Sequence, residues 1–293
     1  MSASNVLFRN ERTWKASEVA LPAGGKQRPP FRWSDIWRAP LHDFPIRDEI
    51  LYQFLPLTPE MDVLEIGPGN GFTAFRLGRQ VRRLTLVDIA SDNIAQLRKA
   101  LREVRNLTFV HADVCGPRLA ESLTDPFDAV FGLEVFEYVT DPGACLRNLA
   151  AVLRPGGLML LQWPNYPPAR TRGVTHIRTR QELDRLFQSA GFETWAVYAL
   201  KLRWPGRVLF QEFHERPLRI YRRLRSRNGA ERPQDFDQTW AFRNRPSLEP
   251  YKCLLHGAWT ILLGAMRAGG DCFTRTLLEG DGLDANLMLL ARR

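Results

Sequence analysis

The stretch Val63-Leu64-Glu65-Ile66-Gly67-Pro68-Gly69-Asn70-Gly71 joins a mostly apolar run to a turn that holds three glycines. The apolar run predicts a buried strand, and the residues from Gly71 to Leu77 favour a helix. Glycine has no Cβ atom, so a glycine-rich turn lets the backbone approach a bound ligand closely. The stretch therefore predicts a strand–turn–helix unit with a ligand-binding loop at the end of its strand.

Strand and helix patterns alternate on both sides of this unit, with short connections. Alternation of this kind is typical of an α/β fold, in which helices cover both faces of a mostly parallel sheet. We expect a doubly wound, seven-stranded sheet with a helical insertion before the last strand. The predicted strands are 63–66, 84–87, 107–110, 127–131, 158–161, 192–197 and 285–290.

The predicted helices have recognisable beginnings and ends. Ser91 is expected to be the N-cap of the helix that carries Ile94, Leu97 and Leu101 on one face. A second helix, with Leu146, Leu149 and Leu153 at helical spacing, is expected to stop at Pro155-Gly156-Gly157. Further helices are predicted at 46–54, at 71–77 and at 180–190, the last of them ending before Gly191.

Four segments follow from the change of pattern along the chain: an irregular arm at 1–44, a core at 45–198, an insertion at 199–282 and a final strand at 283–293. The insertion is basic and aromatic. Its apolar run Cys253 to Met266 is shorter than the ~20 residues of a membrane span and is predicted to be a buried helix.

Two features of the chain bear on its compartment. The first fourteen residues contain no apolar segment of the kind found in secretory signals. The four cysteines form no CxxC pair and show no spacing typical of a metal site, which predicts free thiols. A cytoplasmic protein without a metal centre is expected.

Two other kinds of ligand-binding loop do not fit the residues of the glycine turn. A dinucleotide-binding G-x-G-x-x-G loop needs a small residue at its sixth position, where this chain has the bulky Phe72. A phosphate loop needs Gly-Lys-Ser/Thr, which does not follow here. Glu65 places a carboxylate beside the loop, which favours a cationic ligand such as an amino group or a sulfonium.

On these residues, the chain resembles the class I S-adenosylmethionine (SAM) dependent methyltransferases, especially the branch that includes the ubiquinone-biosynthesis enzymes. The resemblance covers residues 45–198 and the last strand, and it implies a Rossmann-like fold with SAM as the cofactor. It also implies that the E-x-G-x-G-x-G loop surrounds the methionine part of SAM. The matching residues here are Glu65, Gly67, Gly69 and Gly71.

The resemblance assigns further cofactor contacts at the ends of the next strands. It implies that Asp88 binds the ribose hydroxyls, with Ile89 beside the adenine, and that Asp113 meets the adenine amino group, followed by Val114. Leu133 and Glu134 are implied to line the cofactor. Two alternatives remain: Asp88 caps the helix that follows it, and Asp113 only begins a loop.

Three residues are candidates for the chemistry. Glu134-Val135-Phe136-Glu137-Tyr138 resembles a Glu-x-x-Glu-His stretch that is implicated in metal binding in some ubiquinone O-methyltransferases; Tyr138 replaces the histidine, so no metal is predicted. His176 resembles a histidine found before the sixth-strand helix in many enzymes of this branch. It is a candidate general base or substrate contact, and the alternative is a histidine bonded within its loop. The candidate catalytic residues are therefore His176, Glu134 and Tyr138.

The formal charge of +9 and the aromatic residues of the insertion concern the acceptor. We expect a small-molecule, sugar or lipid-linked acceptor, methylated on oxygen, with peripheral membrane contact as an added partner. One alternative is an RNA methyltransferase that uses the basic insertion, although the chain has no recognisable RNA-binding motif. The other is a SAM-fold binding protein without turnover.

Overall fold

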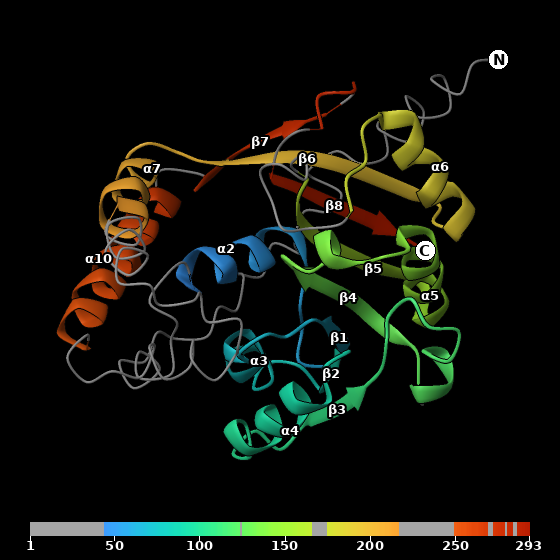
Figure 1. Ribbon diagram of the computed structural model, residues 1–293. Helices are drawn as coiled ribbons and strands as arrows, with labels where there is room; N and C mark the ends of the chain where they lie inside the picture. The colour runs from blue at the N-terminus through green and yellow to red at the C-terminus, as the bar shows by residue number, and fades with distance from the viewer. Residues whose placement is uncertain are drawn as a thin grey trace, which may run out of the picture. The chain divides into compact units, whose positions relative to one another are not determined.

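The computed structural model, drawn in Figure 1, describes residues 44–123, 125–165, 175–216, 249–268, 272–278, 280–283 and 286–293. The expected arm at 1–44 lies almost wholly outside these residues, as does the basic stretch 217–248 of the expected insertion. The chain divides into two compact units. The first comprises Met1–Pro29, Leu51–Leu200 and Arg275–Arg293, and the second comprises Pro30–Ile50 and Lys201–Thr274.

An eight-stranded sheet organises the fold, in the order β3-β2-β1-β4-β5-β8-β6-β7. The seven predicted strands are all present, and β7, which the sequence did not predict, adds an eighth beside β6. The strands are β1 (Asp62–Ile66), β2 (Arg83–Asp88), β3 (Leu107–His111), β4 (Phe127–Leu133), β5 (Leu153–Pro164), β6 (Thr194–Leu202), β7 (Phe273–Leu277) and β8 (Asn286–Arg292).

Strand direction confirms the mostly parallel sheet. Strand β1 pairs in parallel with β2 on one side and with β4 on the other, and the parallel pairs β2–β3 and β4–β5 extend the sheet. Strand β8 is antiparallel to both of its neighbours, β5 and β6. Because both faces of the sheet are covered, the central strands are almost continuously apolar, and all five residues of β1 are buried.

Helices lie on both sides of the sheet (Figure 1), as a doubly wound fold requires. Helix α6 has the predicted bounds and ends at Gly191, whose φ of 86° is the left-handed conformation that favours glycine. The helices are α2 (Phe44–Phe54), α3 (Phe72–Leu77), α4 (Ser91–Ala100), α5 (Pro142–Val152) and α6 (Arg180–Ala190), with short 3-10 turns η2 (Ala120–Ser122) and η3 (Phe136–Tyr138).

Two predicted helix boundaries were wrong. Ser91 is the first helical residue of α4 instead of its N-cap, because Ala90 precedes the helix and no side chain caps it. Leu153 does not belong to α5; it begins β5, where it lies opposite Phe127. The turn Pro155-Gly156-Gly157 therefore falls inside β5, at a register shift, and it does not end a helix directly.

The second unit contains α7 (Gly206–Leu209), the π-helical turn η4 (Phe210–Glu215) and the twenty-residue helix α10 (Glu249–Ala268). The rings of Phe210 and Trp259 pack 6.4 Å apart, and Trp259 is fully buried. A helix was predicted across Cys253 to Met266 and is present, but it is buried on one side only, since Leu254 and Ile261 are 70% and 76% exposed. Within the described residues, no helix combines the length and the apolar character that crossing a membrane needs.

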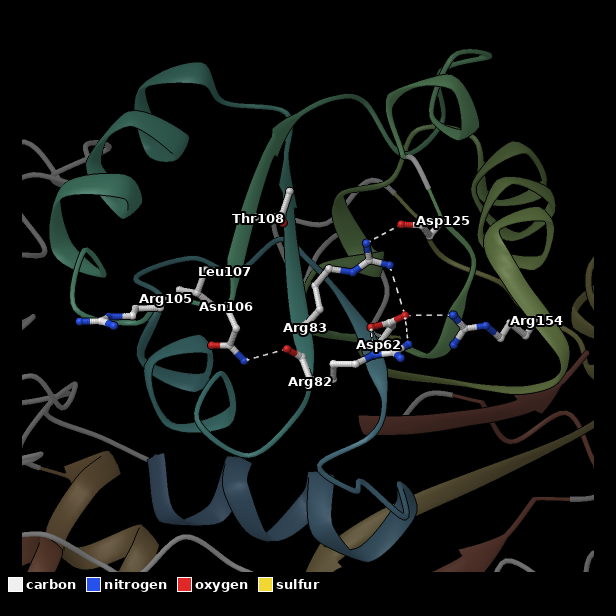
Figure 2. A pocket seen from close by; sticks show the side chains of 9 residues that line it. All are labelled: Asp62, Arg82, Arg83, Arg105, Asn106, Leu107, Thr108, Asp125 and Arg154. Carbon is white, nitrogen blue, oxygen red and sulfur yellow. Dashed lines mark hydrogen bonds and ion pairs between the residues drawn. The ribbon is translucent and has the colours of Figure 1, made fainter.

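An ion-pair network joins the amino ends of four strands (Figure 2). Asp62, at the start of β1, has a side chain that is only 4% exposed. Its carboxylate accepts hydrogen bonds from Arg82 (2.9 and 2.5 Å), Arg83 (3.3 Å) and Arg154 (2.9 Å). Arg154 also pairs with Asp128 at 2.5 Å. One buried carboxylate thus holds three guanidinium groups from two separate segments of the chain, the adjacent Arg82 and Arg83 and the distant Arg154.

These groups line an open pocket of about 520 Å³ at the amino edge of the sheet. Burial alone would raise the pKa of Asp62, but the hydrogen bonds from Arg82 and Arg154 and the charge of Arg83 outweigh burial and lower that pKa. A lowered carboxyl pKa means that ionised Asp62 stabilises the folded state. We therefore interpret this pocket as a structural junction between strands.

Prediction for the junction: Asp62→Asn should lower the free energy of unfolding by about 2 kcal/mol, because it leaves three guanidinium groups facing an uncharged side chain. The difference from the wild type should be full above the ordinary carboxyl pKa of about 3.9 and should shrink as the pH falls through the lowered pKa of the folded state. Denaturant unfolding at several pH values measures it. Asp125→Asn is the matched control, since the Asp125 side chain is 53% exposed and its pair with Arg83 should contribute less than about 1 kcal/mol. Equal losses in the two variants would contradict the interpretation.

Candidate cofactor site at the carboxyl edge of the sheet

The residues predicted to bind a cofactor come together at one edge of the sheet. They follow the carboxyl ends of β1, β2, β3 and β4, which are neighbours in the order β3-β2-β1-β4. The registers bring the strand ends together, since Ile66 lies opposite both Val87 and Gly132. In an open parallel sheet, ligands bind in the crevice outside these ends, where the strand order reverses, and here β1 is the strand at which it reverses.

The glycine turn is fitted closely to its surroundings at Gly67. Its φ is +59°, and a Cβ atom built there would lie 2.4 Å from Val135 Cγ2. The amide of Gly67 donates to Val87 O at 2.9 Å, which joins the turn to β2. Only glycine satisfies both the positive φ and the close approach of Val135. The turn after β1 is therefore held against the residue that follows Glu134.

Gly69, at the tip of the turn, has the opposite environment. Its φ is +53°, but a Cβ atom built there would have no atom within 4 Å. Packing inside the protein therefore does not explain the glycine at this position. A backbone that approaches a ligand does explain it, because a side chain would fill the space that the ligand needs.

Asp88 ends β2 and points both of its carboxylate oxygens at the start of α4. Oδ1 accepts from the amide of Ala90 at 2.9 Å, and Oδ2 accepts from Asn93 Nδ2 at 2.6 Å. The alternative role of Asp88, as a support for the helix that follows, is thus present in the structure. It does not exclude ribose binding, because each carboxylate oxygen has a second lone pair.

The neighbouring loop residues differ in how they are used. Asp113 is exposed and accepts the amide of Cys115 at 2.8 Å, which is the loop-forming role weighed against adenine binding. Val114 is half-buried, and its carbonyl accepts from Asn148 at 2.9 Å. Ile89 is 67% exposed, a high value for a large apolar side chain next to a buried strand. A flat apolar ligand group such as adenine would cover it.

Glu134 follows the buried Leu133 at the end of β4 and has a φ of +55°, the one positive value among the non-glycine residues described. This conformation costs about 1–2 kcal/mol and is typical of residues at functional sites. The Glu134 amide donates to Gln162 O at 3.0 Å, which fixes the turn against β5. Glu134 and the 57% exposed Tyr138 both follow the carboxyl end of β4, the same edge of the sheet as the glycine turn.

His176 lies beside this turn because the residues on both sides of it are anchored. The amide of Thr175 donates to Glu137 O at 3.0 Å. The amide of Ile177 donates to Asn165 Oδ1 at 3.1 Å, and Asn165 Nδ2 donates back to Ile177 O at 2.8 Å. Asn165 is fully buried and also donates to Leu283 O at 3.1 Å. The half-buried His176 is therefore held at the end of β4 and β5 by a rigid backbone.

Two features of this edge were missed in the sequence. The positive φ of Glu134 has no signal, since glutamate is not a residue that favours that conformation. Asn165 follows the apolar run of the fifth predicted strand and has no local signal of its role. Its bonds to residues 177 and 283 depend on the folded chain and could not be inferred from spacing.

A family model described as a methyltransferase domain matches residues 42–197, more than half of the chain. The chain therefore belongs to the class I SAM-dependent methyltransferases. SAM is the cofactor of this family, and the open space at Gly69, the carboxylates and the exposed Ile89 at the carboxyl edge fit it. The particular contacts with SAM stay predictions for all ten residues: Glu65, Gly67, Gly69, Gly71, Asp88, Ile89, Asp113, Val114, Leu133 and Glu134.

Curated relatives align with about half of the chain. A ubiquinone biosynthesis O-methyltransferase from Albidiferax ferrireducens is 31% identical over 142 residues, which are 47% of this chain and 55% of that protein. A tRNA 5-carboxymethoxyuridine methyltransferase from Escherichia coli K12 is 28% identical over 144 residues, 48% of this chain and 49% of that protein. The chain thus spans about half the length of the curated relatives it matches.

A solved structure supports the fold over a larger part of the chain. The phosphoethanolamine N-methyltransferase 2 of Haemonchus contortus, solved in complex with S-adenosyl-L-methionine, has a TM-score of 0.51 and 15% identity. The match covers 100% of this chain and 60% of that one. At this identity, the likeness concerns the fold alone.

Prediction for the glycine turn: Gly69→Ala should leave the protein folded and weaken SAM binding by about tenfold or more, equivalent to about 1.4 kcal/mol, because the new methyl group fills the space left for the ligand. Gly156→Ala is the matched control, since Gly156 also has a positive φ (+79°) and open space around it but lies at the amino end of the sheet. Calorimetric titration with SAM and thermal melts measure both. Equal losses of affinity in the two variants would show that backbone strain, and not the ligand space, is responsible.

Prediction for Asp88: Asp88→Ala should weaken SAM binding by about an order of magnitude, because a carboxylate that meets two ribose hydroxyls is lost. A modest loss of stability should accompany it, since the bonds to Ala90 and Asn93 are also lost. Asn93→Ala removes one of those bonds, retains the carboxylate, and should bind SAM as the wild type does. Unchanged affinity of Asp88→Ala in calorimetry would remove Asp88 from the site.

Proposed function

We propose that the chain transfers the methyl group of SAM to an oxygen atom of a small-molecule, sugar or lipid-linked acceptor. The observation that carries this proposal is the clamped position of His176 beside the turn Glu134–Tyr138, at the edge where the family binds its cofactor. A hydroxyl acceptor must lose a proton as it is methylated, and an imidazole is the side chain best suited to take it near neutral pH.

The roles follow from the geometry of the edge. SAM supplies an activated methyl group, so the protein mainly has to align the acceptor. His176 accepts the proton of the acceptor hydroxyl, and Tyr138, which is exposed there, contacts the acceptor. Glu134 orients the cofactor side of the site through its constrained backbone. The anchors at Asn165 and Thr175 keep the imidazole in place without rearrangement.

We assign acceptor recognition to residues 199–282 and a partial lid to residues 1–44, around the core at 45–198 and the last strand at 283–293. The similarity to a ubiquinone biosynthesis O-methyltransferase supports an oxygen acceptor. The second candidate is RNA, which the similarity to a tRNA methyltransferase and the charge of +9 favour. A SAM-binding protein without turnover is the third.

The experiment that tests the function uses SAM with a labelled methyl group. The purified protein is incubated with three fractions of a bacterial extract: organic-soluble molecules, small polar molecules and RNA. Label in either of the first two fractions, released by treatments that cleave methyl ethers or esters, supports the proposal. Label in RNA selects the second candidate, and binding of SAM without label in any fraction selects the third.

Prediction for His176: His176→Ala should lower kcat by about a hundredfold or more with SAM binding unchanged, because the proton acceptor is lost and the cofactor contacts are kept. His176→Gln can form hydrogen bonds but cannot take up the proton, so it should be equally inactive. Turnover with the labelled acceptor and calorimetry with SAM measure both effects. Activity restored by glutamine would make His176 a substrate contact, and near-normal turnover of both variants would dismiss it from the site.

A further inference from the structure

The segment Lys201–Leu209, which runs from the end of β6 into α7, exposes an unusual combination of side chains. Trp204 is 71% exposed and Val208 is 42% exposed, two of the few large apolar side chains that are open to solvent in the described chain. Soluble surfaces rarely keep a tryptophan this open without a function, because about 25 cal/mol is lost for each Å² of apolar surface left in water.

Both side chains lie around the start of the short helix α7. The amide of Arg207 donates to Arg203 O at 3.0 Å, and the amide of Leu209 donates to Pro205 O at 3.1 Å, so a tight turn joins the end of β6 to α7. Trp204 lies in this turn and Val208 lies in α7, and both side chains are open to solvent. Gly206, between them in sequence, is buried against Leu202. The segment therefore has an inner face at Gly206 and an outer apolar face.

Basic side chains surround the outer apolar face. Lys201, Arg203 and Arg207 are all exposed, and the segment 201–209 contains no aspartate or glutamate. The nearest described acidic side chain along the chain after it, Glu212, is paired with Arg216 at 2.6 Å. A tryptophan and a valine next to three exposed cations match the boundary between lipid headgroups and acyl chains, where an amphipathic ring enters the bilayer and cations meet anionic headgroups.

We propose that Trp204 and Val208, flanked by Lys201, Arg203 and Arg207, form a docking surface for a membrane that contains anionic lipid. The charge pattern favours an anionic membrane over a second copy of the chain and over a nucleic acid. A second copy of the chain would need an acidic surface to match the three cations. A nucleic acid would engage the arginines but would leave Val208 in water. The membrane contact does not depend on the proposed function. Only its purpose, which is to reach a lipid-linked acceptor, rests on the proposed function.

Helix α10 provides a control surface, which exposes apolar side chains as the segment 201–209 does but has no charged residues between 253 and 266. Leu254 and Ile261 are 70% and 76% exposed and lie seven residues apart, on one face of the helix. The stretch 253–266 contains no lysine, arginine, aspartate or glutamate. Ile261 therefore matches Trp204 as an exposed apolar residue, and it differs in lacking cationic neighbours in its own segment.

The test is co-sedimentation of the full chain with vesicles, in the absence of SAM and of any acceptor. Vesicles of phosphatidylcholine mixed with phosphatidylglycerol should retain the wild type, and added salt should release it. Trp204→Ser should lower the partition coefficient by about tenfold or more. Ile261→Ser should leave it unchanged. Calorimetry with SAM and thermal melts check that both variants are folded.

Several results would overturn the docking surface. Equal binding to phosphatidylcholine alone would show that the cations have no role, and equal losses in the two variants would show a general attraction of apolar surface. Absence of sedimentation, with a dimer that Trp204→Ser dissociates, would assign the face to a second copy. If the wild type binds an oligonucleotide but no vesicles, and Trp204→Ser loses that binding, the face would be assigned to nucleic acid. The vesicle assay measures no turnover. Failure of membrane docking therefore does not contradict the proposed function, and failure of methyl transfer does not contradict membrane docking.

Discussion

The parallel pairing of β1 with both β2 and β4 is the constraint on which the rest of the structure depends. A strand with parallel neighbours on both sides has to be covered on both faces, which explains why every residue of β1 is buried. The crossovers on its two sides run in opposite directions, because the chain passes from β1 to β2 and β3 and then returns to β4. In open sheets of this kind such a reversal is the place where ligands bind, and the glycine turn lies there, at the carboxyl end of β1.

The two edges of the sheet show opposite solutions for polar groups. At the amino edge, the buried carboxylate of Asp62 is saturated by three guanidinium groups, so its charges are directed at one another (Figure 2). At the carboxyl edge, apolar side chains stay exposed at Ile89 and Tyr138, and the backbone is strained at Glu134. In this protein the charged groups of the amino-edge pocket are paired with one another, whereas the predicted cofactor edge keeps large side chains exposed.

The sequence predicted those parts of the structure that depend on local pattern. The apolar runs identified seven strands, and the glycine turn lies after the first of them as predicted, since both depend on neighbouring residues. The sequence did not predict features that depend on contacts between distant parts of the folded chain. Strand β7 lies at the edge of the sheet and has no buried apolar run, Asn165 bonds to a carbonyl 118 residues away, and Asp88 supports the start of α4 in place of Ser91. The expected buried helix was half right, because an apolar sequence alone does not tell which faces find a partner.

The place of β8 in the sheet has a consequence for biosynthesis. Strand β8 separates β5 from β6. The side chain of Gln162 in β5 donates a hydrogen bond to Asn286 in β8, which lies 124 residues further along the chain. At about 5–20 residues per second, a ribosome needs on the order of ten seconds to make that stretch. During this interval β5 has an open hydrogen-bonding edge next to an apolar face, and β6 has no strand to join. The nascent chain is therefore exposed to mispairing between the synthesis of β5 and that of β8, and its yield in a cell should depend on chaperones that shield unpaired strands until translation has passed residue 292.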